Sequence, residues 1–476
     1  MEWVGLVMLA LVVIVLVTSG LPAFVVLIGV SVLFATGGIA AGVLPYPLMT
    51  ALPFRVLGLL ETDLLQALPL YVLMGALLDH LPLADTLFRA GAVALSRTRA
   101  APLLSAIGVG VMLAPMNGSV GASAATLSRV LYPRLRARGV PAGPSLSLVC
   151  VTSTLGVVMP PSLVLILLGD TMLRAHTEAI NTTGTMVRVI NTQDVFRGAL
   201  PPAGLFVLAS LAVAWWAGRQ VSDGAGTRAR LGPIGWLVAI IAPAFIIGLL
   251  AAVTTGYLYA VEAAATGALA LFVFGILSRQ LHGATLSAVL RDTMAVTGAL
   301  FALFVAATTF TLVFRGFGSD RLLAALIARV PGNATEIALA LLLLLGLCAF
   351  VLDAFEIILV IIPVVVPPVL IRVPDAVWLA VLALLVLQTS FLVPPFGYGV
   401  MMARNRIGQH VALRQLIGGL APYLCAQFLI VVAVISIPQL THVLLRDSER
   451  AEAGQLTPEE VHRQLETISP VAEPHD

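Results

Sequence analysis

Charged side chains are scarce in this chain of 476 residues, and lysine is absent altogether. Asp, Glu, Lys and Arg together make up 11% of the sequence, whereas a soluble globular chain carries about 25%. With 59% hydrophobic residues, the composition excludes a soluble globular protein and predicts a polytopic membrane protein. The formal net charge of +2 gives no reason to expect a nucleic-acid partner.

Paired cysteines and clustered histidines are also lacking. Cys150, Cys348 and Cys425 lie in apolar segments without CxxC or Cys/His spacing, which argues against a disulfide framework or a zinc site. No HExxH, GxSxG or Walker pattern occurs, so we do not expect an enzyme. The N-terminus has no basic region before its apolar run, which is too long for a signal peptide. We expect two spanning helices there, at residues 3–19 and 21–38.

Proline pairs interrupt two apolar runs in the same way. TSTLGVVMPPS, at residues 152–162, and LQTSFLVPPFG, at 387–397, each place polar residues, three apolar residues and two prolines inside a segment of spanning character. The two proline pairs are 234 residues apart, close to half the chain. Paired interruptions in corresponding positions of two halves point to the substrate site of a secondary transporter. A general excess of Pro and Gly in membrane helices does not explain matching positions.

An apolar hairpin precedes each interrupted span. The first, at 100–138, has a polar tip at 115–119, arginines on both flanks, and legs shorter than the roughly 20 residues of a crossing. The second, at 337–370, has fewer flanking arginines. The positive-inside rule therefore predicts that the first enters from the cytoplasm and the second from the opposite face. Non-helical backbone at membrane depth is buried in protein or lines a wet cavity, so both tips are candidate binding sites.

Polar and ionisable groups gather at the tips and the breaks. Asp353 and Glu356, at the second tip, predict a cation or substrate site, with helix capping by Asp353 as the alternative. Oxygen ligands without a highly charged cage suit Na⁺, although a single hydroxyl in a membrane helix usually bonds its own backbone. The candidate ligands of about two Na⁺ ions are Ser119, Ser123, Thr152, Thr154, Gly156, Asp353, Thr389 and Ser390. The candidate substrate-binding residues are Asn117, Gly118, Ser119, Pro160, Pro161, Glu356, Gln388, Pro394 and Pro395.

Four segments resemble one known family: GSVGASAATLSRVLYPRLRARG at 118–139, TLGVVMPPS at 154–162, DAFEIILVIIPVVVPP at 353–368, and LQTSFLVPPFG at 387–397. They are similar to the large membrane (M) subunit of TRAP transporters, the tripartite ATP-independent periplasmic carriers, in the branch labelled for mannitol and chloroaromatic compounds. The resemblance covers residues 5–440. It departs at 259–264, where relatives commonly read TPTEAA and this chain reads YAVEAA.

The resemblance implies an elevator mechanism, coupling to Na⁺, a small four-helix Q-type membrane subunit and a periplasmic solute-binding protein. Because the chain opens with its first span, we expect the Q-type subunit to be a separate protein. The implied function is import of a small organic acid, such as a 2-oxo or 2-hydroxy monocarboxylate, as the permease subunit of a secondary transporter. A stand-alone Na⁺-coupled carboxylate or anion carrier of similar inverted-repeat fold is the alternative, and it would need no binding protein.

The expected fold is an all-α polytopic membrane protein with two inverted-topology repeats, about ten spans and two re-entrant hairpins. Residues 1–99 would form scaffold spans and interfacial arm helices, and residues 100–170 and 335–403 the two halves of the transport domain. Residues 171–334 would hold an extracytoplasmic loop, scaffold spans and a repeat linker at 218–232. The last span would lie at 404–444 and a polar acidic tail at 445–476. We expect the chain in the bacterial inner membrane, in contact with lipid, with both termini periplasmic.

Overall fold

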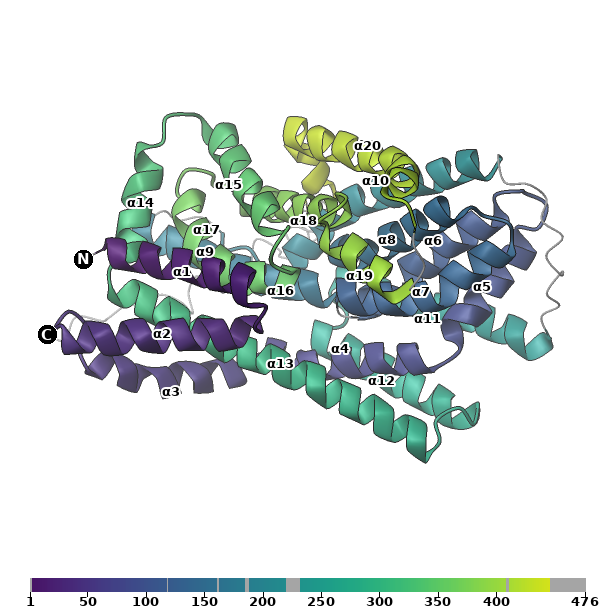
Figure 1. Cartoon of the computed structure of the whole chain (residues 1–476), viewed down its shortest axis with the longest axis horizontal. Helices are drawn as coiled ribbons and strands as arrows, with labels where there is room; N and C mark the ends of the chain where they lie inside the picture. The colour runs from purple at the N-terminus through teal and green to yellow at the C-terminus, as the bar shows by residue number, and fades with distance from the viewer. Residues whose placement is uncertain are drawn as a thin grey trace, which may run out of the picture.

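The computed structural model describes residues 2–117, 119–160, 162–184, 188–219, 232–407 and 411–445. Within these ranges the regular structure is entirely helical, as the composition predicts (Figure 1). The helices are α1 (Trp3–Ser19), α2 (Ala23–Ala40), α3 (Pro47–Leu60), α4 (Asp63–His80), α5 (Leu83–Ala94), α6 (Ala101–Leu113), η1 (Pro115–Asn117), α7 (Val120–Ala137), α8 (Ala142–Val158), α9 (Leu163–Thr183), α10 (Thr192–Gly218), α11 (Pro233–Thr255), α12 (Ala260–Leu277), α13 (Gly283–Gly316), α14 (Ser319–Arg329), α15 (Ala334–Cys348), α16 (Ala354–Glu356), the π-helical turn η2 (Ile357–Ile361), α17 (Ile362–Leu370), α18 (Ala376–Leu392), α19 (Tyr398–Ile407), α20 (Leu413–Ser436) and η3 (Pro438–Thr441).

The structure has fewer helices long and apolar enough to cross a membrane than the ten spans that the sequence predicts. Among the described residues, seven segments are long and apolar enough to cross, and the bent pair α3–α4 would make eight. The α8–α9 segment counts as one of the seven, whereas α1 and α18, with 17 residues each, fall short. The prediction of about ten spans is therefore not confirmed. Three of the four hairpin legs are apolar helices too short to cross: α6, α15 and the segment Ala354–Leu370. The fourth leg, α7, is polar.

One expected loop is a helix. Residues 170–193 were expected to form a polar extracytoplasmic loop, but α9 continues to Thr183 and α10 begins at Thr192. The buried positions of this extension, Met172, Ala175, His176 and Ala179, recur at the spacing of one helix face. Its charged residues lie on the other face, where Asp170 and Arg174 form an ion pair at 2.8 Å. The expected linker at 218–232 and tail at 445–476 lie almost wholly outside the described residues.

The boundaries of the helices repeat along the chain. A shift of 234 residues carries α8 (Ala142–Val158) onto α18 (Ala376–Leu392) and the start of α7 onto the start of α16. In Figure 1, α6 and α7 lie to the right of α18, and α15 and α17 lie to its left. The two hairpins therefore approach the middle of the molecule from opposite ends of its long axis.

The helices pack in two groups. We call α6–α10 and α15–α20 the hairpin block, and α1–α4 with α11–α13 the scaffold block, which runs along the lower part of Figure 1. Helices α5 and α14 pack on the hairpins, α5 against α6 and α14 against α17. Helix α10 was expected among the scaffold spans, but it packs against α6, α18 and α20. Its small buried positions, such as Gly198 and Ala203, let neighbouring helices approach closely.

Burial separates the centre of the molecule from its surface. Helices α8 and α18 bury nearly every side chain, whereas α11 buries only Leu249 and Val253. An apolar helix with this little burial faces lipid or a partner helix rather than water. The two broken helices therefore form the centre around which the hairpins are placed.

Candidate functional site

The tip of the first hairpin is closed by two serines. Ser119 caps α7, because its hydroxyl oxygen accepts a hydrogen bond from the backbone N–H of Ala122 at 3.1 Å. The hydroxyl of Ser123 donates across the tip to the carbonyl oxygen of Ala114 at 3.3 Å. Gly118 and the side chain of Asn117 lie outside the described residues. Both predicted serine ligands thus lie at one turn of the chain, beside an N-terminal helix end of partial positive charge.

The hydroxyls at the end of α8 bond their own helix. Thr152 donates to Leu148 O at 2.8 Å and Thr154 to Val151 O at 3.0 Å, and both side chains are fully buried. This is the ordinary use of threonine in a membrane helix. A hydroxyl oxygen that donates its hydrogen keeps lone pairs, so the two oxygens can still act as ligands.

Two glycines bring the first hairpin against α8. A Cβ atom at Gly156 would lie 2.4 Å from the carbonyl oxygen of Ala114, and one at Gly110 would lie 2.4 Å from Cβ of Thr152. Only hydrogen fits at such distances. The hairpin tip, Thr152 and Gly156 therefore come together, as the sequence analysis predicts for one half of the site.

The first break lies directly beyond these contacts. Helix α8 ends with a hydrogen bond from Met159 N–H to Leu155 O at 3.0 Å, and Pro160 has no N–H with which to continue it. Helix α9 starts afresh with Ser162 as its cap, accepting from Leu165 N–H at 3.1 Å. Pro160 is buried, and Pro161 lies outside the described residues.

The tip of the second hairpin is a reciprocal cap made by its two carboxylates. Oδ1 of Asp353 accepts from the N–H groups of Phe355 at 2.8 Å and Glu356 at 3.2 Å, while Oε2 of Glu356 accepts from Asp353 N–H at 3.1 Å. The capping role of Asp353 is therefore confirmed. Both side chains are half-buried, and neither has an ion-pair partner among the described residues. The π-helical turn η2 follows at once, a distortion that is frequent at functional sites.

The second break is built differently from the first. The Thr389 hydroxyl donates to Leu385 O at 2.7 Å, and Ser390 Oγ lies 3.4 Å from the place of a Cβ atom on Gly346, in the second hairpin. Pro394 is half-buried and Pro395 exposed, with a cis peptide bond between them. The chain then turns sharply at Gly397, whose N–H donates to Val393 O at 2.7 Å. Ser390 therefore faces hairpin 2, as Thr152 faces hairpin 1.

Gln388 is not brought together with the hairpin tips. Its Oε1 accepts from Nε2 of Gln427 on α20 at 3.0 Å, and both side chains are fully buried. Gln427 Nε2 also donates to Leu385 O at 3.3 Å. Gln388 was predicted to bind substrate, but in this structure it joins α18 to α20.

Tyr398 joins the two halves, and the sequence analysis did not single it out. It begins α19, directly after the second break, and its hydroxyl oxygen lies 3.0 Å from the place of a Cβ atom on Gly121 in hairpin 1. The phenol of the second half therefore packs against hairpin 1 of the first half. The signal that could have found it is its position, one residue after the LQTSFLVPPFG motif.

Comparison with known proteins shows which family the chain belongs to. Residues 9–440 match the DctM component family of tripartite ATP-independent periplasmic (TRAP) transporters. The chain belongs to this family. A protein of Haemophilus influenzae, described as a TRAP transporter large permease protein, is 23% identical over 388 residues, which cover 80% of this chain and 90% of that protein. This chain is therefore a multi-pass membrane transporter component and not an enzyme.

A solved structure supports the fold. The YdaH transporter of Alcanivorax borkumensis superposes with a TM-score of 0.58 at 16% sequence identity, covering 82% of this chain and 87% of that one. At this identity the similarity concerns the fold alone. The two proteins share a fold. The site residues of the TRAP permease are therefore assigned from the contacts within its own structure.

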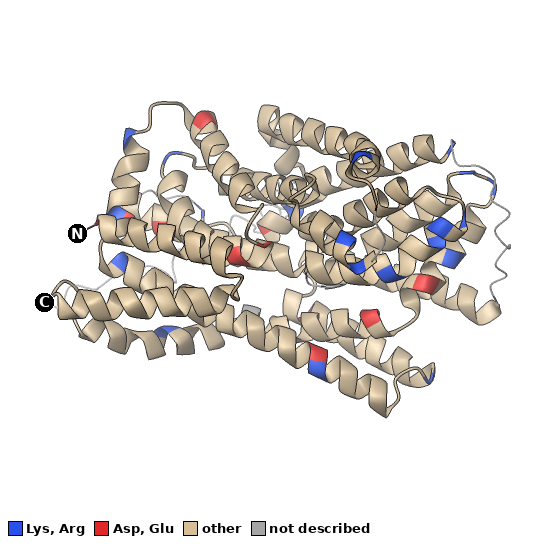
Figure 2. Cartoon of the chain, viewed as in Figure 1, with Lys and Arg blue, Asp and Glu red and all other residues tan. Residues whose placement is uncertain are grey.

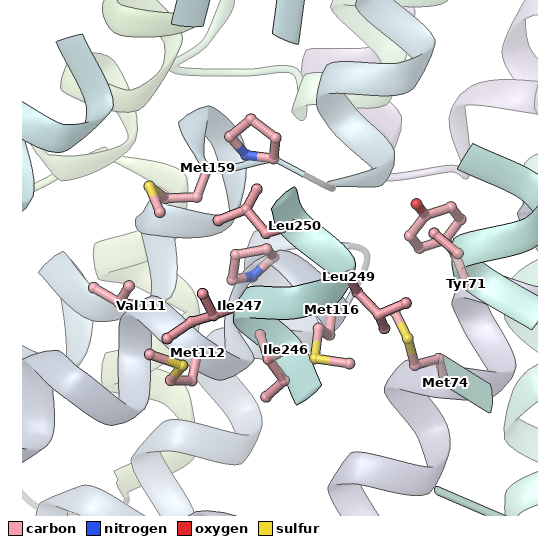
Figure 3. A pocket seen from close by; sticks show the side chains of 13 residues that line it. Tyr71, Met74, Val111, Met112, Met116, Met159, Ile246, Ile247, Leu249 and Leu250 are labelled. Carbon is pink, nitrogen blue, oxygen red and sulfur yellow. The ribbon is translucent and has the colours of Figure 1, made fainter. Parts of the chain in front are cut away.

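Several cavities lie between the hairpin block of the TRAP permease and its scaffold block, and two of them flank the hairpins. One, of about 480 Å³, lies between α3, α9, α13 and the second leg of hairpin 2, and Arg55, Arg174 and Arg315 line it with Asp170 and Glu178. Arg315 of α13 pairs with Glu178 of α9 at 2.7 Å. The other, of about 70 Å³, lies beside the tip of hairpin 1 and is almost wholly apolar (Figure 3). The contact between the blocks is therefore polar beside hairpin 2 and apolar beside hairpin 1.

Proposed function

We propose that this chain is the permease subunit that carries a small organic acid across the bacterial inner membrane together with Na⁺. The observation that carries this proposal is the packing at the centre of the fold, where hairpin 1 and α19 lie against the broken helix α8, α8 lies against α18, and the tip of hairpin 2 lies against α9. Four helices, α7, α9, α16 and α19, begin at the tips and breaks, and helix N-termini favour anions. A carboxylate would find its partners at these helix ends.

The oxygen atoms at the tips and breaks fit Na⁺. The first group contains Ser119, Ser123, Thr152 and Thr154 with the carbonyl groups around Gly156, and the second contains Asp353, Thr389 and Ser390. All are hard oxygen donors of the kind that Na⁺ accepts. Two bound cations would supply positive charge beside the anionic solute. The carboxylates of Asp353 and Glu356, which form no ion pair with any of the described residues, support the second site most directly.

An elevator movement of the hairpin block along the scaffold block would explain the weak contact between them. Where the blocks meet, the pair Glu178–Arg315 has both side chains about one-third exposed, at 35% and 33%, and an ion pair of this kind contributes about 0–1 kcal/mol. Such a contact can break and reform during each cycle.

Cross-linking tests this movement. In a variant without the three native cysteines, Glu178→Cys and Arg315→Cys should be joined by a cleavable bifunctional thiol reagent, and uptake should stop until the link is cleaved. Each single-cysteine variant, treated in the same way, should retain uptake. Full uptake by the cross-linked protein would exclude relative movement of α9 and α13.

Orientation and partners follow from charge and exposure. Arginines outnumber acidic residues around α7, at the right of Figure 2, so the positive-inside rule places that end in the cytoplasm and the opposite end in the periplasm. The exposed apolar face of α11 is available to lipid or to a Q-type subunit.

A membrane-impermeant maleimide should label Ala137→Cys and Thr335→Cys from opposite sides, since both positions are exposed at the outer ends of hairpins 1 and 2. Labelling from one side would refute the inverted topology.

Uptake measurements test the function directly. Proteoliposomes holding this chain with its small partner should accumulate labelled pyruvate, lactate or a related acid only when Na⁺ and the binding protein are both present. Uptake that needs Na⁺ but no binding protein would make this chain a stand-alone carrier. Uptake that is independent of Na⁺ would refute the coupling.

A further inference from the structure

The cavity of about 480 Å³ beside hairpin 2 is bordered by both apolar and charged side chains. Phe304 and Arg315 of α13 both line it, and they are 11 residues apart, or about 16 Å of helix. One leaflet of a bilayer has a hydrocarbon thickness of about 15 Å, half of the roughly 30 Å of the whole core. Leu359 and Pro363 of hairpin 2 add to the apolar wall. The cavity therefore combines apolar walls with a length close to the depth of one leaflet.

The charged part of the lining has an excess of positive charge. It consists of three arginines and two carboxylates, namely Arg55 of α3, Arg174 of α9, Arg315 of α13, and Asp170 and Glu178 of α9. Arg174 pairs with Asp170 at 2.8 Å. Arg315 pairs with Glu178 at 2.7 Å, whereas Arg55 forms no ion pair with any of the described residues. Each guanidinium has five N–H donors, so the two paired arginines keep donors for a further anion.

A second cavity continues the first along α9. It has a volume of about 730 Å³, shares both ion pairs with the first cavity, and adds Thr177, Asn181 and Thr182. The hydroxyl and amide groups of these three residues can bind a polar, uncharged group. The two cavities together thus offer apolar walls, a cluster of arginines and a polar extension. A phospholipid has matching parts in its acyl chain, its phosphate and its polar headgroup.

Helix α3 opens the first cavity to the lipid phase. It is largely apolar, but none of its side chains is buried, and Phe54 and Leu57 are 76% and 55% exposed. An apolar helix of this kind lies against lipid or a partner rather than water. Arg55 stands between these two residues in the chain and lines the cavity. An arginine with an apolar stem and a charged end suits such a boundary.

We propose that this cavity binds one anionic phospholipid, whose phosphodiester contacts Arg55, Arg174 and Arg315 and whose acyl chain lies along Phe304 toward hairpin 2. The single negative charge of a phosphodiester balances the excess charge of the lining, and arginine is well matched to its paired oxygen atoms. Helices α3, α9 and α17 lie toward the left of Figure 1, so in the proposed orientation the lipid comes from the periplasmic leaflet. Because α3 and α13 belong to the scaffold block, and α9 and hairpin 2 to the hairpin block, one lipid contacts both blocks.

Lipid binding to the detergent-purified complex of this chain with its small partner tests the proposal. The probes are dioleoylphosphatidylglycerol, dioleoylphosphatidylcholine and glycerophosphoglycerol, which is the headgroup of the first lipid without its acyl chains. Each is titrated by native mass spectrometry and by the shift in thermal unfolding. Phosphatidylglycerol should bind at least tenfold more tightly than phosphatidylcholine, and glycerophosphoglycerol should not bind at the same concentrations.

Three results of these titrations would overturn the proposal. Equal binding of the two lipids would show that the arginines do not select an anionic headgroup. Binding of glycerophosphoglycerol as tight as that of the whole lipid would make this a site for a soluble phosphodiester. Displacement of bound phosphatidylglycerol by pyruvate or lactate would assign the cavity to the transported solute.

Two substitutions locate the binding in the cavity. Arg55→Gln should weaken binding of phosphatidylglycerol about tenfold, near the lower end of the contribution of one charged hydrogen bond, and leave phosphatidylcholine unaffected. Arg329→Gln is its control, because Arg329 of α14 is also exposed but does not line the cavity. Glu178→Gln should strengthen binding of phosphatidylglycerol about threefold, since it raises the excess positive charge of the lining and removes a weak competing ion pair.

The affinity ratio of the two lipids is compared within one variant, so a general loss of stability does not change it. An unchanged ratio in both Arg55→Gln and Glu178→Gln, or an equal loss of binding in Arg329→Gln, would overturn the assignment. Failure of this lipid site would leave the proposed transport function standing, because that function does not depend on it.

Discussion

Asp353 offers the sharpest test of the candidate cation site, because its two roles can be separated by one substitution. As a helix cap it uses only an oxygen atom that accepts N–H groups. Asparagine provides the same oxygen and ranks with aspartate as a cap. Asp353→Asn should therefore leave the stability of hairpin 2 nearly unchanged while it removes the negative charge.

The size of the effect follows from the surroundings of the carboxylate. No arginine or histidine among the described residues forms an ion pair with Asp353, so its charge can act on a bound cation together with that of Glu356 at the same tip. Two unit charges about 4 Å apart interact by roughly 4 kcal/mol at an effective dielectric constant of about 20. If only a third of that energy is lost with the charge, about 1.4 kcal/mol, the affinity for the cation falls tenfold. The Na⁺ concentration at half-maximal uptake should rise by at least that factor.

The assay is uptake into proteoliposomes as a function of Na⁺ concentration, at saturating solute and binding protein. Asp375→Asn is the control, because Asp375 also caps a helix, α18, accepting from Trp378 N–H at 2.9 Å, and lies outside the hairpin tips. Its carboxylate also lies 3.4 Å from Nε2 of His442, so this variant controls for the Na⁺ dependence and not for stability. Asp353→Asn should unfold in detergent within about 1 °C of the wild type, and Asp375→Asn should keep the wild-type Na⁺ dependence. A wild-type Na⁺ dependence in Asp353→Asn would refute the cation role and leave Asp353 as a cap alone.

Two further predictions concern packing at the breaks. Gly156→Ala should lower uptake strongly and destabilise the protein by about 1–3 kcal/mol, because the new methyl group would overlap the carbonyl oxygen of Ala114. Its control is Gly108→Ala, because nothing lies within 4 Å of that Cβ position. This control should change neither the uptake rate nor the thermal midpoint. Gln388→Leu and Gln427→Leu should each lower stability by about 1–3 kcal/mol, since each breaks the hydrogen bond between the two buried amides, whereas the double variant, which removes both amides, should be close to wild type in thermal unfolding. A double variant that is stable but inactive would return Gln388 to the substrate site.

The sequence predicts the two breaks because part of their signal is local. A proline pair lacks two backbone N–H groups and favours the end of a helix, and the structure ends α8 at Val158 and α18 at Leu392 beside such pairs. The pairs at 201–202 and 367–368 lie inside α10 and α17 without ending them, so the surroundings of a pair also decide whether it breaks the helix. The capping of α16 by Asp353 was weighed for the same reason. Residues 170–183 were misjudged, because their polar residues were taken as a sign of a loop when they form the polar face of an amphipathic helix.

Orientation of side chains could not be read from the sequence. Gln388 lies in the same motif as Thr389 and Ser390, but three successive helical residues point in different directions, and the position of α20 decides that Gln388 is paired. Tyr398 likewise gained its place against hairpin 1 only when α19 packed against α7 and α8.

The sequence by itself determined that this protein is an all-helical membrane transporter, because composition and sequence motifs depend on no contact between distant residues. Only the tertiary structure decided which polar groups meet. It joined Tyr398 to hairpin 1, paired Glu178 with Arg315, and buried the hydroxyl of Tyr71 without a hydrogen-bond partner among the described residues. These are contacts between segments far apart in the chain, and they exist only once the helices have packed.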